Sequence, residues 1–149
     1  MFASFYSGLI TLGTFLQPFI LLAIRLFWGW EFFDGGLGKL KDINPVIEYF
    51  GSLGIPFPTL NAYLVGSIET VGGLCLLLGF ASRLAAIPLM CVMGVALFTA
   101  YPDVVTKMFA DPLAFTHMEP FNFLLASLLI FAFGPGYISI DALLKRFVR

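Results

Sequence analysis

The fold is decided by residues 60–101, where LNAYLVGSIETVGGLCLLLGF (60–80) and LAAIPLMCVMGVALFTAY (84–101) are separated by Ala-Ser-Arg alone. Each run approaches the length of about 20 apolar residues that a helix needs to cross the hydrocarbon core of a bilayer. A connection this short leaves two helices side by side and antiparallel. We therefore predict a hairpin of two membrane-spanning helices over these residues.

Two further apolar runs flank this hairpin, at 15–33 and 117–134, and the second of them is short for a span. A bilayer core has no water to hydrogen-bond the backbone, so we expect all four runs to be helical. The polar, glycine-rich stretch DGGLGKLKDINP (34–45) predicts a non-helical connection, followed by a short amphipathic segment at the interface. The tail ISIDALLKRFVR (138–149) predicts an amphipathic interfacial helix with Ser139 as its cap.

The composition favours a membrane protein with a single domain over residues 1–149. Of these residues, 60% are hydrophobic and 11% are charged, whereas soluble domains carry about 25% charged residues. The formal net charge of −1 provides no basic surface for nucleic acid. The predicted fold class is an all-α integral membrane protein, a four-helix transmembrane bundle with a short C-terminal interfacial helix, surrounded by the lipid bilayer.

Charged residues inside the apolar runs are the first candidates for a site, because a charge in the membrane is costly and marks function or pairing. They are Arg25 and Glu31 in the first run and Glu69 in the second. Glu69 shares a helical face with the glycines at 66, 72 and 73, so we expect it to face the bundle interior. Arg25 and Glu69 each lie about ten residues from the same membrane surface, which predicts that they pair, for structure or within a binding site.

A second polar cluster is expected toward the opposite membrane surface, and both clusters together define a candidate site for a quinone head group. The candidate ligand-binding residues are Arg25, Glu31, Lys39, Glu69, His117, Glu119 and Asn122. With apolar walls from Trp28, Phe32 and Phe121, they predict a pocket between the first and fourth runs that reaches toward Glu69. Ordinary interfacial polarity is the alternative for Lys39 and His117. With one histidine in the chain, no bis-histidine haem, flavin or metal site can be assigned.

Several short motifs, taken in order, resemble the DoxX family of small membrane proteins. They are Arg25-x3-Gly29, Gly36-Leu-Gly-Lys39, YFGSLGIPFP (49–58), Glu69-Thr-Val-Gly72-Gly73 with LLLGFASRLAA (76–86), Glu119 at the start of the last run, and GPGYISIDALL (134–144). The resemblance covers the chain from about residue 20 to residue 144 and rests on the order and spacing of these motifs. One position departs from the family pattern, because many relatives have a histidine where this chain has Gly35.

The resemblance implies a four-helix bundle related to the membrane part of thiosulfate:quinone oxidoreductase, in a bacterial inner membrane. The positions at which the family carries polar residues correspond to Arg25, Lys39, Glu69, Arg83 and Glu119 in this chain. It implies an integral membrane subunit of a redox system that interacts with quinone in electron transfer, as the quinone-reactive subunit of an oxidoreductase, with a redox or membrane protein as partner. Whether the chain is itself an enzyme stays open.

Two other functions remain as alternatives at this stage. The chain could be a non-catalytic membrane anchor or assembly subunit that docks a partner enzyme. A small carrier is less favoured, because no inverted repeat is visible in the sequence. The basic residues at 83, 145, 146 and 149, against those at 39, 41 and 107, predict that both termini are cytoplasmic.

Overall fold

The computed structural model describes residues 2–147, and this part of the chain folds into helices and turns without a strand. The helices are α1 (Phe2–Lys41), α2 (Ile43–Ser52), α3 (Pro58–Leu78), α4 (Ser82–Ala100), α5 (Pro102–Thr106), α6 (Pro112–Thr116), α7 (Glu119–Phe133) and α8 (Ile140–Phe147). Among the described residues, α1, α3 and α4 are long and apolar enough to cross a membrane, and α7 is a shorter apolar helix. The predicted all-α membrane fold is confirmed.

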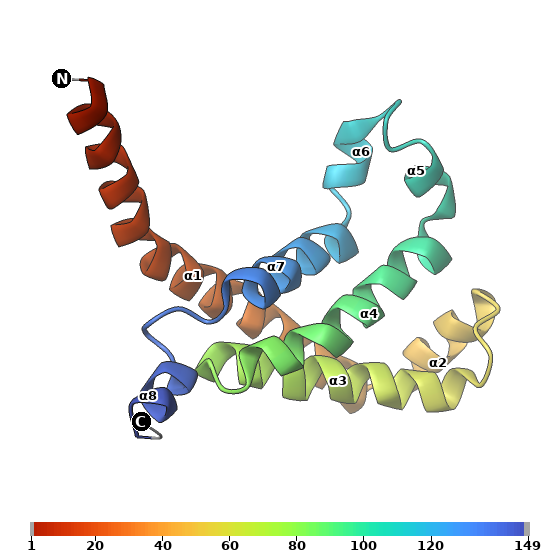
Figure 1. Cartoon of the computed structure of the whole chain (residues 1–149). Helices are drawn as coiled ribbons and strands as arrows, with labels where there is room; N and C mark the ends of the chain where they lie inside the picture. The colour runs from red at the N-terminus through yellow and green to blue at the C-terminus, as the bar shows by residue number, and fades with distance from the viewer. Residues whose placement is uncertain (1, 148–149) are drawn as a thin grey trace.

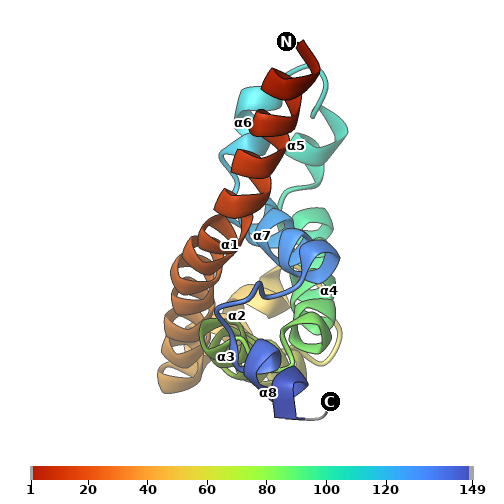
Figure 2. The ribbon, with the colours of Figure 1, turned by 60° about the vertical axis from the view of Figure 1, so that its left-hand side comes forward.

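The four apolar helices pack into one bundle, in which α1 contacts α3 and α7, and α4 contacts α3 and α7. Its buried centre is formed by Phe32, Leu76, Leu89, Met93 and Ile130. The short helices α2, α5 and α6 lie at one end of the bundle, whereas α8 lies at the other end, where the middle of α1 joins the bundle near Pro18 (Figures 1 and 2). The bundle therefore has two ends, each bordered by short helices, on either side of an apolar centre.

The predicted hairpin is α3 followed by α4, with boundaries within two residues of the apolar runs. Gly79 ends α3 with a φ of 68°, a left-handed conformation that suits glycine. Ala81 also has a positive φ of 46°, which is uncommon for a residue with a side chain. Asp141 of α8 stabilises this turn, since its carboxylate accepts hydrogen bonds from the N–H groups of Ala81 (2.7 Å) and Ser82 (3.0 Å). Asp141 of α8 thus caps the N-terminus of α4.

The predicted non-helical connection over residues 34–45 is wrong, because α1 continues to Lys41 and α2 starts at Ile43. Of the three glycines in this stretch, Gly36 lies against α3, whereas a Cβ atom added to Gly35 or Gly38 would meet nothing within 4 Å. A Cβ atom added to Gly36 would come within 2.5 Å of the backbone nitrogen of Thr70, and one added to Gly73 within 2.4 Å of that of Phe33. Glycine is therefore what lets the two backbones touch.

The first half of α1 stands apart from the bundle (Figure 1). At about 1.5 Å per residue, its 40 residues span about 60 Å, twice the thickness of a bilayer core. Residues 5–17 are all exposed, and Pro18 lies within the helix where it meets the bundle. The predicted span of 15–33 lies within α1, whose packed part runs from about Leu21 to Leu40.

Three smaller predictions concern the ends of the other elements. The expected amphipathic segment after residue 44 is α2, and the expected tail helix is α8, where the Ser139 hydroxyl accepts a hydrogen bond from the N–H of Ala142 (3.1 Å). Val148 and Arg149 of that predicted tail lie outside the described residues. The fourth run, predicted over 117–134, is the helix α7 over Glu119–Phe133, because α6 ends at Thr116 and is followed by a break in the helix at residues 117 and 118.

Candidate functional site

Arg25 is buried, with 2% of its surface exposed, and its guanidinium group holds three segments together. Its Nε donates to the Leu76 carbonyl (2.9 Å) and its Nη2 to the Leu77 carbonyl (3.2 Å), at the C-terminal end of α3. Its Nη1 donates to the carbonyls of Pro135 (2.6 Å) and Ile138 (2.7 Å) in the loop before α8. The carbonyls at a helix C-terminus lack partners within the helix and carry a partial negative charge, so a cation suits them.

The predicted pair between Arg25 and Glu69 is therefore wrong. Arg25 bonds to residues that follow Glu69 by seven or eight positions, which is about 10 Å along a helix axis. The two depths were wrongly matched because the first span was taken to begin at residue 15, whereas the packed part of α1 begins at about Leu21, four residues before Arg25. Arg25 lies at the α8 end of the bundle and acts there as a structural clamp.

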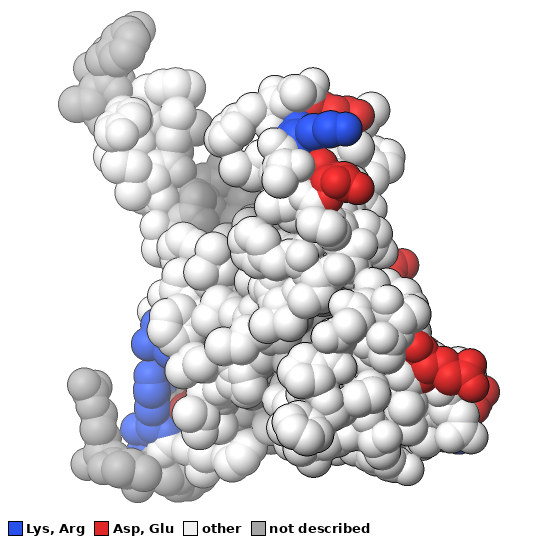
Figure 3. Space-filling view, turned by 90° about the vertical axis from the view of Figure 1, so that its right-hand side faces the viewer, with Lys and Arg blue, Asp and Glu red and all other residues white. Residues whose placement is uncertain are grey.

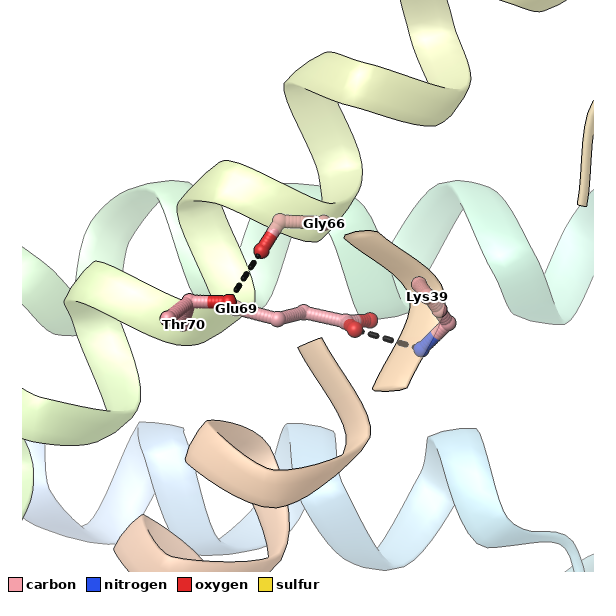
Figure 4. A network of polar contacts seen from close by, with 4 residues as sticks. All are labelled: Lys39, Gly66, Glu69 and Thr70. Atoms are coloured by element: carbon pink, nitrogen blue, oxygen red, sulfur yellow. Dashed lines mark hydrogen bonds and ion pairs between the residues drawn. The ribbon is translucent and has the colours of Figure 1, made fainter. Parts of the chain in front are cut away.

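Glu69 pairs instead with Lys39, whose ammonium group donates a hydrogen bond to its carboxylate (Figure 4). Glu69 lies near the middle of α3, so this ion pair is at about the middle of the span. The Glu69 side chain is 4% exposed, as the glycine face predicted, and the Lys39 side chain is 35% exposed. Beside the pair, the Thr70 hydroxyl donates to the Gly66 carbonyl within α3 (2.7 Å).

A cavity of about 960 Å³ begins at this ion pair and extends between α1, α2, α3, α4 and the start of α7. Its charged lining side chains are Glu31, Asp34, Lys39, Glu69 and Glu119. Its walls are largely apolar, with Ile68 from α3, Val92 and Met93 from α4, and Phe123 from α7. Tyr49 and Tyr101 at its rim are exposed, so the cavity is open to its surroundings.

The cavity brings together four of the seven predicted site residues, namely Glu31, Lys39, Glu69 and Glu119. Arg25, His117 and Asn122 are not among its lining residues. His117 is exposed at the end of α6, and the Asn122 amide donates to the carbonyls of Thr116 (3.1 Å) and Met118 (3.2 Å). These two residues thus belong to the connection between α6 and α7.

The apolar wall also differs from the predicted one. Trp28, Phe32 and Phe121 do not line the cavity, although the rings of Trp28 and Phe32 contact that of Phe123, with centroids 4.9 and 4.5 Å apart. Phe123 therefore forms the wall, and the two predicted rings of α1 support it from behind. The first and fourth apolar helices do touch, as the predicted pocket required.

The sequence analysis missed the lining residues of α3 and α4. In α4, Pro88, Val92, Val95 and Thr99 follow one another at spacings of three or four residues and so share one helical face. In α3 a spacing of four residues leads from Asn61 through Val65 to Glu69. This periodicity was present in the sequence and could have extended the site outward from Glu69.

Replacing Lys39 by methionine is expected to destabilise the protein by about 1–3 kcal/mol, because Glu69 then loses its hydrogen-bonding partner in an apolar setting. The decrease in the free energy of unfolding should be smaller than for a fully buried ion pair, since Lys39 is partly exposed. The double variant Lys39→Met/Glu69→Gln should recover much of it. Unfolding by SDS in mixed micelles measures the three variants, and Lys41→Met serves as the control because Lys41 is exposed. An unchanged stability of Lys39→Met would contradict the pairing.

The donor set of the cavity suits an organic head group better than a metal ion. Within residues 2–147 no three His, Cys, Asp or Glu side chains converge as a metal site would require. Lys39 provides a hydrogen-bond donor, the carboxyl groups can exchange protons, and the apolar walls can hold a planar ring or an aliphatic chain.

Comparisons with known proteins give a consistent family relationship. A sequence model of the DoxX family matches residues 20–102. "Putative oxidoreductase CatD" of Bacillus subtilis is 35% identical over 66 residues, which cover 44% of this chain and 48% of CatD. "Inner membrane protein YphA" of Escherichia coli is 28% identical, covering 84% of this chain and 90% of YphA. The membrane protein Rv3486 of Mycobacterium tuberculosis is 32% identical, covering 87% of this chain and 83% of its own length. No solved structure matches the chain significantly.

Proposed function

Because the chain belongs to the DoxX family, we propose that it is the integral membrane subunit of a redox system and that it binds a quinone in the cavity at Lys39 and Glu69. The observation that carries this proposal is the ion pair at the inner end of an apolar-walled cavity near the middle of the membrane span. Intramembrane ionisable groups usually serve a function, because their insertion is costly. The name of the relative "Putative oxidoreductase CatD" favours the same class of activity.

The residues present fit a quinone head group. The Lys39 ammonium is the more exposed member of the pair, so it can donate a hydrogen bond to a carbonyl oxygen in the cavity. Glu69 fixes the position of Lys39 by accepting its hydrogen bond. The walls formed by Ile68, Val92 and Phe123 would exclude water from the ring and accommodate an aliphatic tail.

A bound quinone would supply the redox chemistry, since its reduction to the quinol takes up two electrons, here from a reduced partner protein, and two protons. The chain's own part is to hold and move the protons. Glu31 and Glu119 line the same cavity as the ion pair, and both are exposed. They can therefore take protons from water and pass them inward to Glu69.

Gly35 also lies on the cavity lining, and a Cβ atom added there would meet nothing within 4 Å. This is the position where many family members have a histidine, and this chain has room for such a side chain. The proton-exchanging groups in this protein would thus be the carboxyl groups of Glu31, Glu69 and Glu119.

We infer the orientation from the segregation of charge between the two ends. The α8 end carries the basic residues Arg25, Arg83, Lys145 and Arg146, with Asp141 as its acidic residue. The α2 end carries Lys41 and Lys107 together with the acidic residues Asp42, Glu48, Asp103, Asp111 and Glu119. The charged residues Glu31, Asp34, Lys39 and Glu69 lie along the packed parts of α1 and α3. Figure 3 shows Lys and Arg atoms along the lower left edge and in one further patch at the top, with acidic atoms at the top and right. The α8 end is therefore assigned to the cytoplasm of a bacterial inner membrane.

Cys91 provides a native reporter for binding, because it is exposed and lines the cavity. In a Cys75→Ser background, a short-chain quinone analogue is expected to slow alkylation of Cys91 by a lipid-soluble maleimide at least about threefold, by occupying the space in front of it. Lys39→Met should lose this protection, whereas Lys41→Met should keep it because Lys41 does not line the cavity. Equal protection in the Lys39→Met protein, or none in the parent, would refute binding at this site.

A second candidate function is a non-catalytic subunit that docks a partner enzyme. The observation in its favour is the first half of α1, whose residues 5–17 are exposed and stand apart from the bundle. A photo-crosslinking residue at position 9 or 12 should then capture a defined protein in native membranes. Capture of that protein, combined with Cys91 alkylation that no quinone analogue slows, would favour docking alone.

A further inference from the structure

A second cavity, of about 1390 Å³, lies at the α8 end, on the opposite side of the bundle from the Lys39–Glu69 pair. Its charged lining residues are Arg83, Lys145, Arg146 and Asp141. Its apolar lining includes Pro18 and Leu21 of α1, Leu84 of α4, Phe133 of α7 and Leu144 of α8. The cavity therefore combines a basic side with an apolar side, at the level where α4 begins and α7 ends.

The basic side is not neutralised by the rest of the described structure. Both carboxylate oxygens of Asp141 accept hydrogen bonds from the backbone of Ala81 and Ser82. Arg83 donates one long hydrogen bond to the Ala132 carbonyl (3.3 Å). Lys145 and Arg146 form no ion pair or hydrogen bond with the side chains that the structure describes. Three cationic groups thus border one cavity and leave their charge available to an anion.

The frame around these cations is well fixed. Arg25 donates to the carbonyls of Pro135 and Ile138, on either side of the Gly136 turn. A Cβ atom added to Gly136 would lie 3.6 Å from Leu21, and one added to Gly134 would lie 3.2 Å from the Arg83 guanidinium. The turn therefore packs on α1 on one side and carries Arg83 on the other, so the basic and apolar sides keep a constant relative position.

We propose that this cavity binds the head group of an anionic phospholipid, with the phosphate at Arg83, Lys145 and Arg146 and the start of the acyl chains on α1. On α1, Pro18 and Leu21 add to the apolar lining that Leu84, Phe133 and Leu144 provide. A soluble phosphate compound would use the cations and leave this apolar lining unused. Basic cavities between membrane helices at the cytoplasmic surface suit anionic lipid head groups.

The test compares phosphatidylglycerol with phosphatidylcholine, added to the full-length protein in neutral detergent. Native mass spectrometry counts the bound lipid, and thermal unfolding measured by tryptophan fluorescence gives the apparent affinity. We expect phosphatidylglycerol to bind and to raise the unfolding temperature, with phosphatidylcholine having little effect. The triple variant Arg83→Gln/Lys145→Gln/Arg146→Gln should bind phosphatidylglycerol about 100-fold more weakly.

Two further variants and one soluble compound sharpen the test. The charge-conserving triple Arg83→Lys/Lys145→Arg/Arg146→Lys should retain binding, which separates loss of charge from loss of fold. The double variant Lys41→Gln/Lys107→Gln removes two cations from the other end and should also retain it. Equal binding of the two lipids, or undiminished binding in the neutral triple variant, would overturn the proposal. Glycerol 3-phosphate that stabilises the protein as strongly as the lipid would overturn it as well, by assigning the site to soluble phosphates.

Discussion

Replacing Gly73 by alanine is expected to separate α1 from α3 and to destabilise the protein by about 3 kcal/mol or more. The added Cβ would lie 2.4 Å from the backbone nitrogen of Phe33 and 2.8 Å from the Gly29 carbonyl oxygen. Both obstacles are backbone atoms of a helix, so no side-chain rotation can relieve the contact. The helices would have to move apart along the interface that also holds Lys39 against Glu69.

Gly35→Ala is the matched control for this substitution. Gly35 also lies inside a helix, but its added Cβ would meet nothing within 4 Å. Alanine there should be neutral or stabilising by about 0.5–1 kcal/mol, because glycine costs more conformational entropy in a helix. The two variants should therefore change the SDS concentration of half-unfolding in opposite directions. If the Gly73→Ala protein were as stable as the parent and Cys91 were still alkylated at the parent's rate, α1 and α3 would not be packed backbone to backbone.

Strong local patterns were the predictable part of this fold. The two apolar runs around Ala-Ser-Arg gave α3 and α4 to within two residues, because length and hydropathy alone decide such spans. The burial of Glu69 followed from the glycines on its helical face. In each case the information lies within one segment, so no knowledge of the partner helix was needed.

The errors arose where tertiary contact overrides a local tendency. Residues 34–41 contain three glycines and three charges, which locally favour a loop. In the folded protein Gly36 packs on Thr70, and Lys39 is paired, so the helix continues. Intrinsic propensity is a weak prior when backbone packing of this kind is available.

The partner of Arg25 could not be predicted from sequence for a different reason. Its acceptors are backbone carbonyls, which every residue carries, so no residue type marks them. Among the charged side chains, Glu69 was the carboxylate whose expected depth in the membrane matched that of Arg25. It was therefore predicted as the partner of Arg25. The position of a helix C-terminus next to Arg25 would have been the informative signal, because unpaired carbonyls collect there.

The clamp formed by Arg25 leads to the second large expected effect. Arg25→Met should destabilise the protein by about 3–5 kcal/mol, less than the sum of four charged hydrogen bonds at about 1.5–3 kcal/mol each, because such contributions are not additive. The carbonyls of Leu76, Leu77, Pro135 and Ile138 would lose a donor in a setting that water reaches poorly. Arg25→Lys should recover less than half of the loss, since an ammonium group has three donors and cannot span both segments.

The location of the damage distinguishes this clamp from a site that serves a ligand. Loss of Arg25 should loosen the turn before α8 first, and with it the Asp141 cap on α4, so hydrogen exchange should accelerate at Ala81 and Ser82. The Lys39–Glu69 end, about two helical turns away along α3, should keep its exchange rates and its Cys91 reactivity in the population that remains folded. Arg83→Gln is the control at the same end, because Arg83 is exposed and donates one long hydrogen bond, and it should change stability little. If Arg25→Met instead accelerated exchange equally at both ends, Arg25 would be part of a single cooperative core and the division of the bundle into a clamped end and a cavity end would be wrong.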